Sequence, residues 1–305
     1  MIRQTLLTLA MAAGFGFAQE KVPVTMTVTV DAVRGREMPQ LKPEDVMVYH
    51  GRQRLEVTAW NALQGEQSGL ELYILIDDAS GMSLGGELAD LRRFIEAQPA
   101  NALIGIAYMR GDSAEIAQGL TTDHPKASAA LRLPFGRTAT GGSPYLAFND
   151  LLKNWGACCV RREVLIVSSG IDPLGGFGPE NPFVDTAIGQ AQRAGVVVFA
   201  IYTPRAGHSS HSFWQMNWGQ NHLAQLAEET GGESYMLGYQ APVSFTPYLD
   251  DVSEHLKHQY TLTFLIDRPA KPGLVPIRLT TEVPGAEIIG ASKVWVEMTA
   301  AGEAH

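Results

Sequence analysis

Between residues 70 and 258, short apolar runs of strand length alternate with segments whose apolar positions recur every three or four residues. The second pattern places apolar side chains on one face of a helix, as for Leu84, Leu88, Leu91 and Ile95. The expected strands are 72–77, 102–109, 113–119, 163–168, 197–203 and 233–237. The expected helices are 84–95, 123–131, 145–153, 183–194, 220–230 and 245–257. This alternation predicts an α/β fold with a doubly wound, mostly parallel sheet.

The two ends of the chain carry strand patterns without intervening helices. The predicted strands there are 22–30, 46–49, 55–60, 260–266, 275–281 and 291–298. A two-hairpin sheet alone is only marginally stable. We therefore expect the N-terminal segment 20–62 and the C-terminal segment 259–300 to pack together as one small β domain. The α/β domain, 70–258, is then inserted between them.

The first 18 residues have the features of a secretory signal peptide. Arg3 precedes an apolar or small run over 6–17, and Ala18 offers a cleavage point. A retained anchor or an apolar strand is the alternative, but the run is shorter than the roughly 20 residues that span a bilayer. No other stretch is as long and apolar, so we expect a secreted or periplasmic protein without a transmembrane segment in its mature chain.

The net charge and the cysteines of the chain indicate which partners and which kind of stabilisation are not expected. The net charge of −9 argues against nucleic acid as a partner, because binding phosphates requires clustered cations. The two cysteines, Cys158 and Cys159, are adjacent and cannot join distant segments. We expect two thiols near the start of a strand, and no disulfide scaffold despite export.

Oxygen-bearing side chains gather where the first strand of the α/β domain ends. The apolar run 72–76 is followed by Asp77, Asp78 and Ser80. In open α/β sheets, ligands bind outside the carboxyl ends of the strands. Carboxylate and hydroxyl oxygens suit a hard cation such as Mg²⁺. The sequence therefore predicts a site at this edge of the sheet.

From about residue 20 to 300 the chain resembles bacterial proteins called VWFA-related, which are abundant in acidobacteria. Its α/β part is similar to von Willebrand factor type A domains. Three stretches carry the resemblance besides the strand-end motifs: LKPEDVMVY at 41–49, HLAQLAEETGG at 222–232 and HQY at 258–260. The resemblance implies a non-enzymatic binding domain with a metal-ion-dependent adhesion site, formed from three separate elements of the chain.

The first element in that family is Asp-x-Ser-x-Ser. Here Asp78 and Ser80 match, whereas Met82 replaces the second serine and Ser83 stands beside it. A thioether is a poor ligand for Mg²⁺. A register that starts at Asp77 places an alanine where the first serine is expected, and fits less well.

The second and third elements are also altered. The second is a threonine after a Gly-Gly turn, and Ser143 stands in its place with an equivalent hydroxyl. The third is an aspartate within Thr-Asp-Gly, and Ser169 stands there, with Asp172 three residues further on. Carboxylates supply much of the affinity of such sites. The resemblance therefore implies a degenerate site at which Mg²⁺ or Ca²⁺ binds weakly, unless a partner supplies another acid.

Two other motifs have simpler explanations. Arg110-Gly-Asp-Ser113 spells a tripeptide that integrins bind, but it lies between two strand patterns and predicts a tight hairpin turn. His208 and His211 lack a third ligand at a usual zinc spacing. We expect a loop over 205–219.

That predicted loop is a candidate partner-binding surface, because loops carry much of the binding in proteins and exposed aromatic side chains are enriched at interface centres. The candidate residues are His208, His211, Phe213, Trp214 and Trp218.

The leading functional hypothesis is an exported protein that presents its degenerate adhesion site to a protein partner. The first alternative is a structural envelope component with no discrete ligand. The second is a hydrolase that uses a serine of the strand-end cluster, Ser80 or Ser143. No general acid–base pair follows from residue spacing, so we predict that the protein is not an enzyme.

Overall fold

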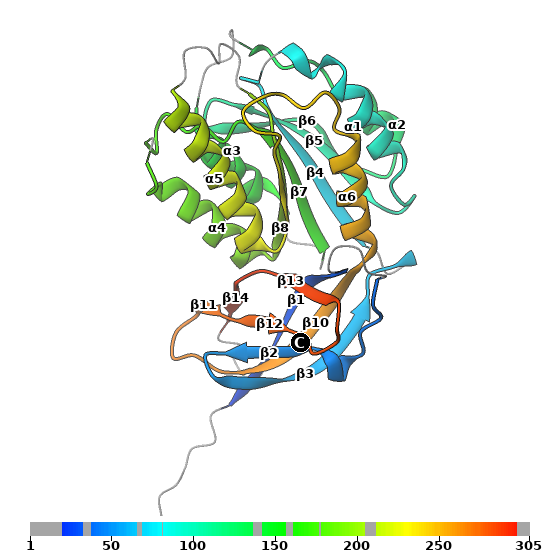
Figure 1. Cartoon of the computed structure of the whole chain (residues 1–305), viewed down its shortest axis with the longest axis vertical. Coiled ribbons are helices and arrows are strands. Elements are labelled where there is room, and N and C mark those ends of the chain that lie inside the picture. The colour runs from blue at the N-terminus through cyan, green and yellow to red at the C-terminus, as the bar shows by residue number, and fades with distance from the viewer. Residues whose placement is uncertain are drawn as a thin grey trace, which may run out of the picture.

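The computed structural model describes residues 20–32, 38–65, 69–80, 82–136, 142–156, 161–176, 178–204 and 212–297, without the side chains of Met82 and Ser83. The predicted signal peptide, both cysteines, His208 and His211 therefore lie outside the described residues. The chain forms an α/β domain stacked on a smaller β domain (Figure 1). Within the described part, no helix has both the length and the apolar character needed to cross a bilayer.

The α/β domain contains a six-stranded sheet in the order β6-β5-β4-β7-β8-β9. All neighbouring strands are parallel except β5 and β6, which form an antiparallel hairpin. The predicted turn at Gly111 and Asp112 connects these two, with Arg110 paired to Ser113. The central strands β4, β7 and β8 are buried along almost their whole length, because helices cover both faces. The strands are β4 (Leu70–Asp77), β5 (Leu103–Arg110), β6 (Ser113–Thr121), β7 (Arg161–Ser168), β8 (Val196–Tyr202) and β9 (Ser234–Tyr235).

Three helices cover each face of this sheet (Figure 1). On one face lie α1 (Glu87–Glu96), α2 (His124–Ala129) and α6 (Thr246–Lys257). On the other lie α3 (Pro144–Asn154), α4 (Pro182–Ala194) and α5 (Phe213–Thr230). The apolar stripe predicted for the first helix, from Leu84 to Ile95, is buried against the sheet. A doubly wound, mostly parallel α/β fold is thus confirmed.

Strands from both ends of the chain form the β domain, as predicted. Its antiparallel sheet has the order β12-β2-β3-β10-β1-β13, and β11 pairs with β14 beside it. The long pairing of β1 with β10 joins the two ends of the chain, with Val24 opposite Phe264. The elements are β1 (Lys21–Ala32), the 3-10 turn Pro43–Asp45, β2 (Met47–His50), β3 (Gln53–Ala62), β10 (Gln259–Asp267), β11 (Gly273–Pro276), β12 (Arg278–Thr280), β13 (Ala286–Gly290) and β14 (Lys293–Val296).

A buried arginine connects the two domains. Arg161, the first residue of β7, donates from Nε to Oε1 of Gln259 (2.6 Å) and from Nη2 to the carbonyl of Leu256 (2.5 Å). Its Nη1 also donates to the carbonyl of Leu63, on the segment that enters the α/β domain (3.4 Å). The amino ends of the parallel strands therefore face the β domain, and their carboxyl ends point away from it (Figure 1).

The structure corrects three sequence predictions. The segment 275–281 is divided into β11 and β12, because its first part pairs with β14 and its second part pairs with β2. Strand β13, which follows the turn at Gly285, was not predicted. The predicted loop over 205–219 is wrong for its second half, because α5 begins at Phe213. Ser212 caps that helix through its side chain, which accepts from the N–H of Gln215.

Candidate functional site

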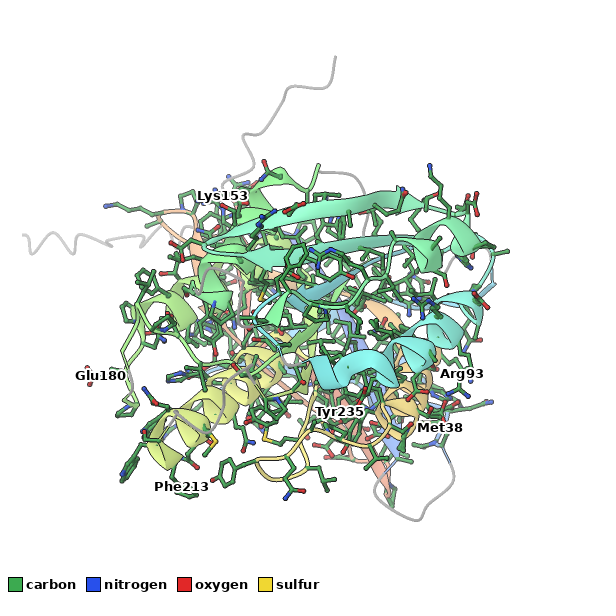
Figure 2. The ribbon with its side chains drawn as sticks, turned by 90° about the horizontal axis from the view of Figure 1, so that it is seen from above. Met38, Arg93, Lys153, Glu180, Phe213 and Tyr235 are labelled. Carbon is green, nitrogen blue, oxygen red and sulfur yellow. The ribbon has the colours of Figure 1, made fainter. Side chains whose placement is uncertain are left out.

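The predicted site residues lie on the edge of the sheet that faces away from the β domain. Asp77 and Asp78 end β4, Ser169 and Asp172 follow β7, and Ser143 precedes α3. Figure 2 looks onto this edge, with Phe213 and Glu180 on one side and Arg93 on the other. The loops at this edge thus bring together residues that are distant in the sequence.

Asp78, the acid that matches the first motif, is paired with an arginine of the same chain. Its side chain is fully buried. Arg132 donates from Nη1 to Oδ1 (2.5 Å) and from Nη2 to Oδ2 (2.8 Å). Bidentate pairing of this kind is among the stronger charge-assisted interactions in proteins. Both oxygens of the carboxylate are therefore engaged by a cation that the fold itself supplies.

Aromatic rings hold the Arg132 guanidinium in place. Its central carbon lies 3.7 Å from the centre of the Tyr108 ring and 4.2 Å from that of Phe135. The Tyr108 hydroxyl donates to the carbonyl of Arg132 (2.9 Å) and accepts from its backbone N–H (2.7 Å). The hydrogen bond to Asp78 raises the pKa of the guanidinium above its ordinary value. Stacking and ion pairing together position the arginine over the buried acid.

Asp77 has a local structural role. Its Oδ1 accepts from the backbone N–H of Ala79 (2.9 Å), and its Oδ2 accepts from the hydroxyl of Ser168 (3.0 Å). The Ser168 hydroxyl in turn accepts from the N–H of Gly170 (3.1 Å). This acid therefore links the turn after β4 to the turn after β7. The nearby Ser80 hydroxyl is fully buried and has no hydrogen-bond partner among the described residues.

Ser143 and Asp172 are brought into direct contact. The Ser143 hydroxyl donates to Oδ2 of Asp172 (2.8 Å) and accepts from the N–H of Leu146, which caps α3. The same carboxylate oxygen accepts from the side-chain amide of Asn181 (3.1 Å). Asp172 is buried, and its Oδ1 accepts from two further backbone N–H groups, of Leu174 (2.9 Å) and Gly175 (3.0 Å).

The remaining residues of this edge also have structural partners. The Ser169 hydroxyl accepts from the N–H of Ile171 (3.3 Å). The backbone N–H of Ser143 donates to Oδ1 of Asp112 (2.9 Å), the acid of the predicted Arg-Gly-Asp turn. Gly142 packs so closely against this turn that an added Cβ would lie 2.1 Å from the carbonyl carbon of Gly111. A side chain at Gly142 would therefore displace the loop that carries Ser143.

The three acids of this edge do not form one cluster. Among the described residues, the only group of three or more histidine, cysteine, aspartate or glutamate side chains with ligand atoms within 4.8 Å is Glu233, Asp251 and His255. Asp251 and His255 lie on α6, and Glu233 immediately precedes β9. Asp77, Asp78 and Asp172 are thus separate, and each has its own set of partners.

The predicted aromatic surface lies on the first turns of α5 and divides into two parts. Phe213 and Trp214 are 60% and 64% exposed, and Phe213 contacts Tyr239 edge-on at 5.0 Å. Trp218 is half-buried and stacks on the buried His222, with ring centres 5.9 Å apart. Burial lowers the pKa of His222, so this imidazole packs in its neutral form. Phe213 and Trp214 therefore remain available for binding, and Trp218 supports the fold.

Other exposed apolar side chains share this end of the molecule. Seven of the eight large apolar residues that are exposed in the described part lie in the loops and the helix end on this side, and Ile116 on β6 is the eighth. The seven are Leu133, Phe135, Leu174, Phe213, Trp214, Leu237 and Val243. We call this set the apolar rim. Sequence patterns did not indicate the members of the rim outside α5, or Arg132, because none of these residues belongs to a periodic segment.

The chain is similar to several solved structures. No protein-family model and no curated protein matches the chain. Similar solved structures include BatB from Bacteroides thetaiotaomicron, with 15% identity and a TM-score of 0.45, over 62% of this chain and 97% of that one. An aerotolerance-related membrane protein from Bacteroides fragilis has 14% identity and a TM-score of 0.44, over 62% and 98%.

A von Willebrand factor type A protein from Catenulispora acidiphila is also similar. It has 10% identity and a TM-score of 0.44, over 82% of this chain and 75% of that one. The structural neighbours thus include von Willebrand factor type A domains, in agreement with the resemblance in the sequence. Identities and TM-scores this low say nothing about what the chain does, and its function has to follow from its own residues.

Proposed function

We propose that this chain is an exported, secreted or periplasmic, non-enzymatic protein that binds a protein partner through the strand-end edge of its α/β domain, without a bound metal ion. The observation that carries this proposal is the ion pair between Arg132 and Asp78. It occupies both oxygens of the acid that would anchor a metal in an intact adhesion site.

The residues at this edge do not fit a Mg²⁺ or Ca²⁺ ion. Such ions take several oxygen ligands, and carboxylates supply much of the affinity. Asp78 is engaged by Arg132, and Asp172 accepts four hydrogen bonds from its surroundings. A bound dication would also lie near a fixed guanidinium, which repels it. We infer that Arg132 replaces the ion as the positive charge of this edge.

The apolar rim supplies the contact surface that this proposal requires. Aromatic residues are enriched at protein interfaces, and tryptophan is common among the residues that contribute most to binding. Trp214 and Phe213 stand at the start of a long helix, so little conformational entropy is lost when they bind. The net charge of −9 remains unfavourable for a nucleic-acid partner.

The serine cluster supports an architectural role. The Ser143 hydroxyl both caps α3 and donates to Asp172. This hydroxyl is fully buried, so it is closed to a substrate. We therefore propose that Ser143 holds the loops of the edge together and takes part in no hydrolysis.

A capture experiment tests the proposal. The full mature chain is immobilised and exposed to an envelope extract, once with Mg²⁺ and once with EDTA. We expect a specific partner in equal yield under both conditions. Its yield should fall strongly with the double variant Phe213→Ala/Trp214→Ala and should not change with Ile116→Ala, the exposed apolar control on β6. Capture that requires Mg²⁺ would contradict the metal-free mode. The absence of any specific partner would favour a structural envelope component.

A further inference from the structure

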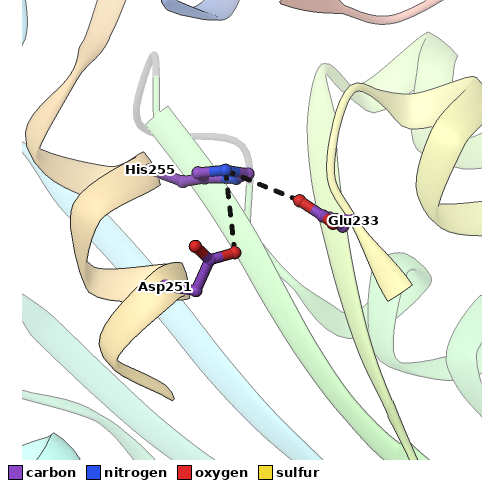
Figure 3. Close-up of side chains that lie close together, drawn as sticks. All are labelled: Glu233, Asp251 and His255. Atoms are coloured by element: carbon purple, nitrogen blue, oxygen red, sulfur yellow. Dashed lines mark ion pairs between the residues drawn. The ribbon is translucent and has the colours of Figure 1, made fainter. Parts of the chain in front are cut away.

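A second group of metal-ligand side chains lies at the opposite end of the α/β domain. Glu233, Asp251 and His255 each direct one ligand atom to a common region, where the three atoms lie within 4.8 Å of one another (Figure 3). Asp251 and His255 belong to α6, and Glu233 immediately precedes β9. None of these residues takes part in the edge described above.

The fold fixes the position of all three side chains. Asp251 and His255 are four residues apart on α6, which places them on the same face of the helix. Glu233 follows the turn that ends α5, at Gly231 and Gly232. Gly232 packs so tightly that an added Cβ would lie 2.0 Å from the carbonyl oxygen of Val198. Two packed elements thus hold the ligands, which reduces the entropy lost when an ion binds.

The distances within the group are long for hydrogen bonds and suitable for shared ligation. Nε2 of His255 lies 3.5 Å from Oε2 of Glu233 and 3.9 Å from Oδ2 of Asp251. Good hydrogen bonds from nitrogen to oxygen are about 2.7–3.2 Å long. A tetrahedral Zn²⁺ with ligands at about 2.0–2.1 Å holds its donor atoms roughly 3.3 Å apart. A small closure of the two carboxylates around Nε2 therefore produces a coordination shell.

The surroundings have the features of an outer shell. The Tyr235 hydroxyl donates to Oδ2 of Asp251 (2.8 Å) and orients that carboxylate. The His255 ring is buried at 5.9 Å from the ring of Phe199, whereas the two acids are half-exposed and open to water.

The local charge favours a cation. Asp31 at the end of β1 and Glu228 on α5 add negative charge around Glu233. Within the described part of the chain, neither Glu233 nor Asp251 forms an ion pair with a lysine or arginine. The group therefore carries excess negative charge, which a bound dication would balance.

We propose that Glu233, Asp251 and His255 form a binding site for a divalent transition-metal ion of the Zn²⁺ class. One imidazole nitrogen and two carboxylate oxygens coordinate the ion, and water completes its shell. The imidazole ligand selects against Ca²⁺ and Mg²⁺, which prefer all-oxygen surroundings. Since α6 continues directly into β10, an ion here connects the short edge strand β9 to the helix that leads into the β domain. The site thus stabilises the junction of the two domains.

Titration calorimetry with ZnCl₂ on the full mature chain tests this site. Asp251→Asn and Glu233→Gln remove one charged ligand each from half-exposed positions, so both variants should fold. Asp250→Asn and His258→Ala are the matched controls, because they change an acid and an imidazole on or just after the same helix. We expect Asp251→Asn and Glu233→Gln to weaken one Zn²⁺ equivalent by more than about 100-fold, beyond the effect of a typical outer-shell change. The controls should bind like the wild type.

Co²⁺ spectroscopy separates this site from the cysteines. We expect visible absorption typical of nitrogen and oxygen ligands, without a sulfur-to-metal charge-transfer band, and its loss in Asp251→Asn. If the wild type binds no Zn²⁺, or if Asp251→Asn and Glu233→Gln bind it as tightly as the wild type, the proposal is wrong. The three side chains then form a polar contact without a bound ion.

Discussion

Arg132 and Asp78, 54 residues apart in the sequence, meet through two parallel hydrogen bonds at the carboxyl end of β4. The acid is fully buried, whereas the arginine is one-third exposed and stacked on Tyr108 and Phe135. A buried carboxylate is costly unless it is paired with a cation or hydrogen-bonded. In this chain the partner is a side chain, and this pairing explains why the strand-end edge can keep its architecture with an incomplete set of metal ligands.

Removal of Arg132 should destabilise the protein. Arg132→Ala leaves the Asp78 carboxylate buried and unpaired, which costs about 3 kcal/mol, the lower end of the range for buried pairs because Arg132 is partly exposed. Arg110→Ala is the matched control, since Arg110 also lies near Phe135 but pairs with the exposed Glu115. Its effect should stay within about 0.5 kcal/mol. Urea denaturation measures both. Equal stability of the two variants would show that the pair with Asp78 contributes little.

Ser143→Ala should cost more than the loss of an ordinary helix cap. The substitution removes the cap of α3 and one of the hydrogen bonds to the buried Asp172, so we expect a loss of about 2–3 kcal/mol. Ser212→Ala removes a comparable but exposed cap, that of α5, and should cost about 1 kcal/mol or less. Thermal unfolding of the two variants gives the comparison. A larger loss for Ser212→Ala would contradict the role assigned to Ser143.

The two tryptophans of α5 should respond differently to substitution. Trp218→Ala removes a half-buried ring that stacks on His222, and should lower the free energy of unfolding by about 1–2 kcal/mol. Trp214→Ala removes a ring that is 64% exposed, and should change it by no more than about 0.5 kcal/mol. Chemical denaturation followed by circular dichroism checks both values. A large effect of Trp214→Ala would mean that this ring supports the fold and is not free for a partner.

Glu163 should make the stability of the protein depend on pH. Burial raises the pKa of this carboxyl from 4.5 to about 8, although the neighbouring Arg161 acts to lower it. The folded state therefore binds a proton that the unfolded state has lost between about pH 4.5 and 8. Within that window stability falls as pH rises, by up to about 1.4 kcal/mol per pH unit. Above pH 8 this loss is complete.

Glu163→Gln tests that dependence. The amide carries no titrating proton, so the variant should lose this component of the pH profile and should gain stability relative to the wild type above pH 8. Glu115→Gln, at an exposed position, should leave the profile unchanged. Denaturant midpoints from pH 5 to pH 9 provide the measurement. A wild-type profile that coincides with that of Glu163→Gln would show that Glu163 is charged in the folded state at neutral pH.

The sequence predicted the α/β architecture well because its central strands are continuous apolar runs, as at 72–76, between helices with clear periodicity. The start of α5 was missed because its first residues follow a segment rich in glycine, serine and histidine, which resembles a loop. Strand β13 was missed because it is short and directly follows Pro284 and Gly285. In both cases the composition of the segment resembles a loop. The tertiary contacts that order it, such as the pairing of β13 with β1, cannot be seen in the sequence.

The candidate site was predictable only in part. Motif positions placed Asp78, Ser143 and Asp172 at one sheet edge, but their partners depend on contacts between distant segments. Arg132 lies in a short nonperiodic stretch, and nothing in the sequence links it to Asp78. Arg161 and Glu163 were unexpected in the interior, because charged side chains are rarely buried unless they are paired. The partners of these buried charged side chains therefore became known only from the structure.

Mg²⁺ titration calorimetry shows whether Arg132 takes the place of a metal ion at Asp78. The titration compares the wild type with Asp78→Asn and with Asp251→Asn, and the second variant identifies any binding at the group of Glu233, Asp251 and His255. We expect millimolar or weaker Mg²⁺ binding by the wild type, unchanged in Asp78→Asn. Tight binding by the wild type that disappears in Asp78→Asn would contradict this role of Arg132.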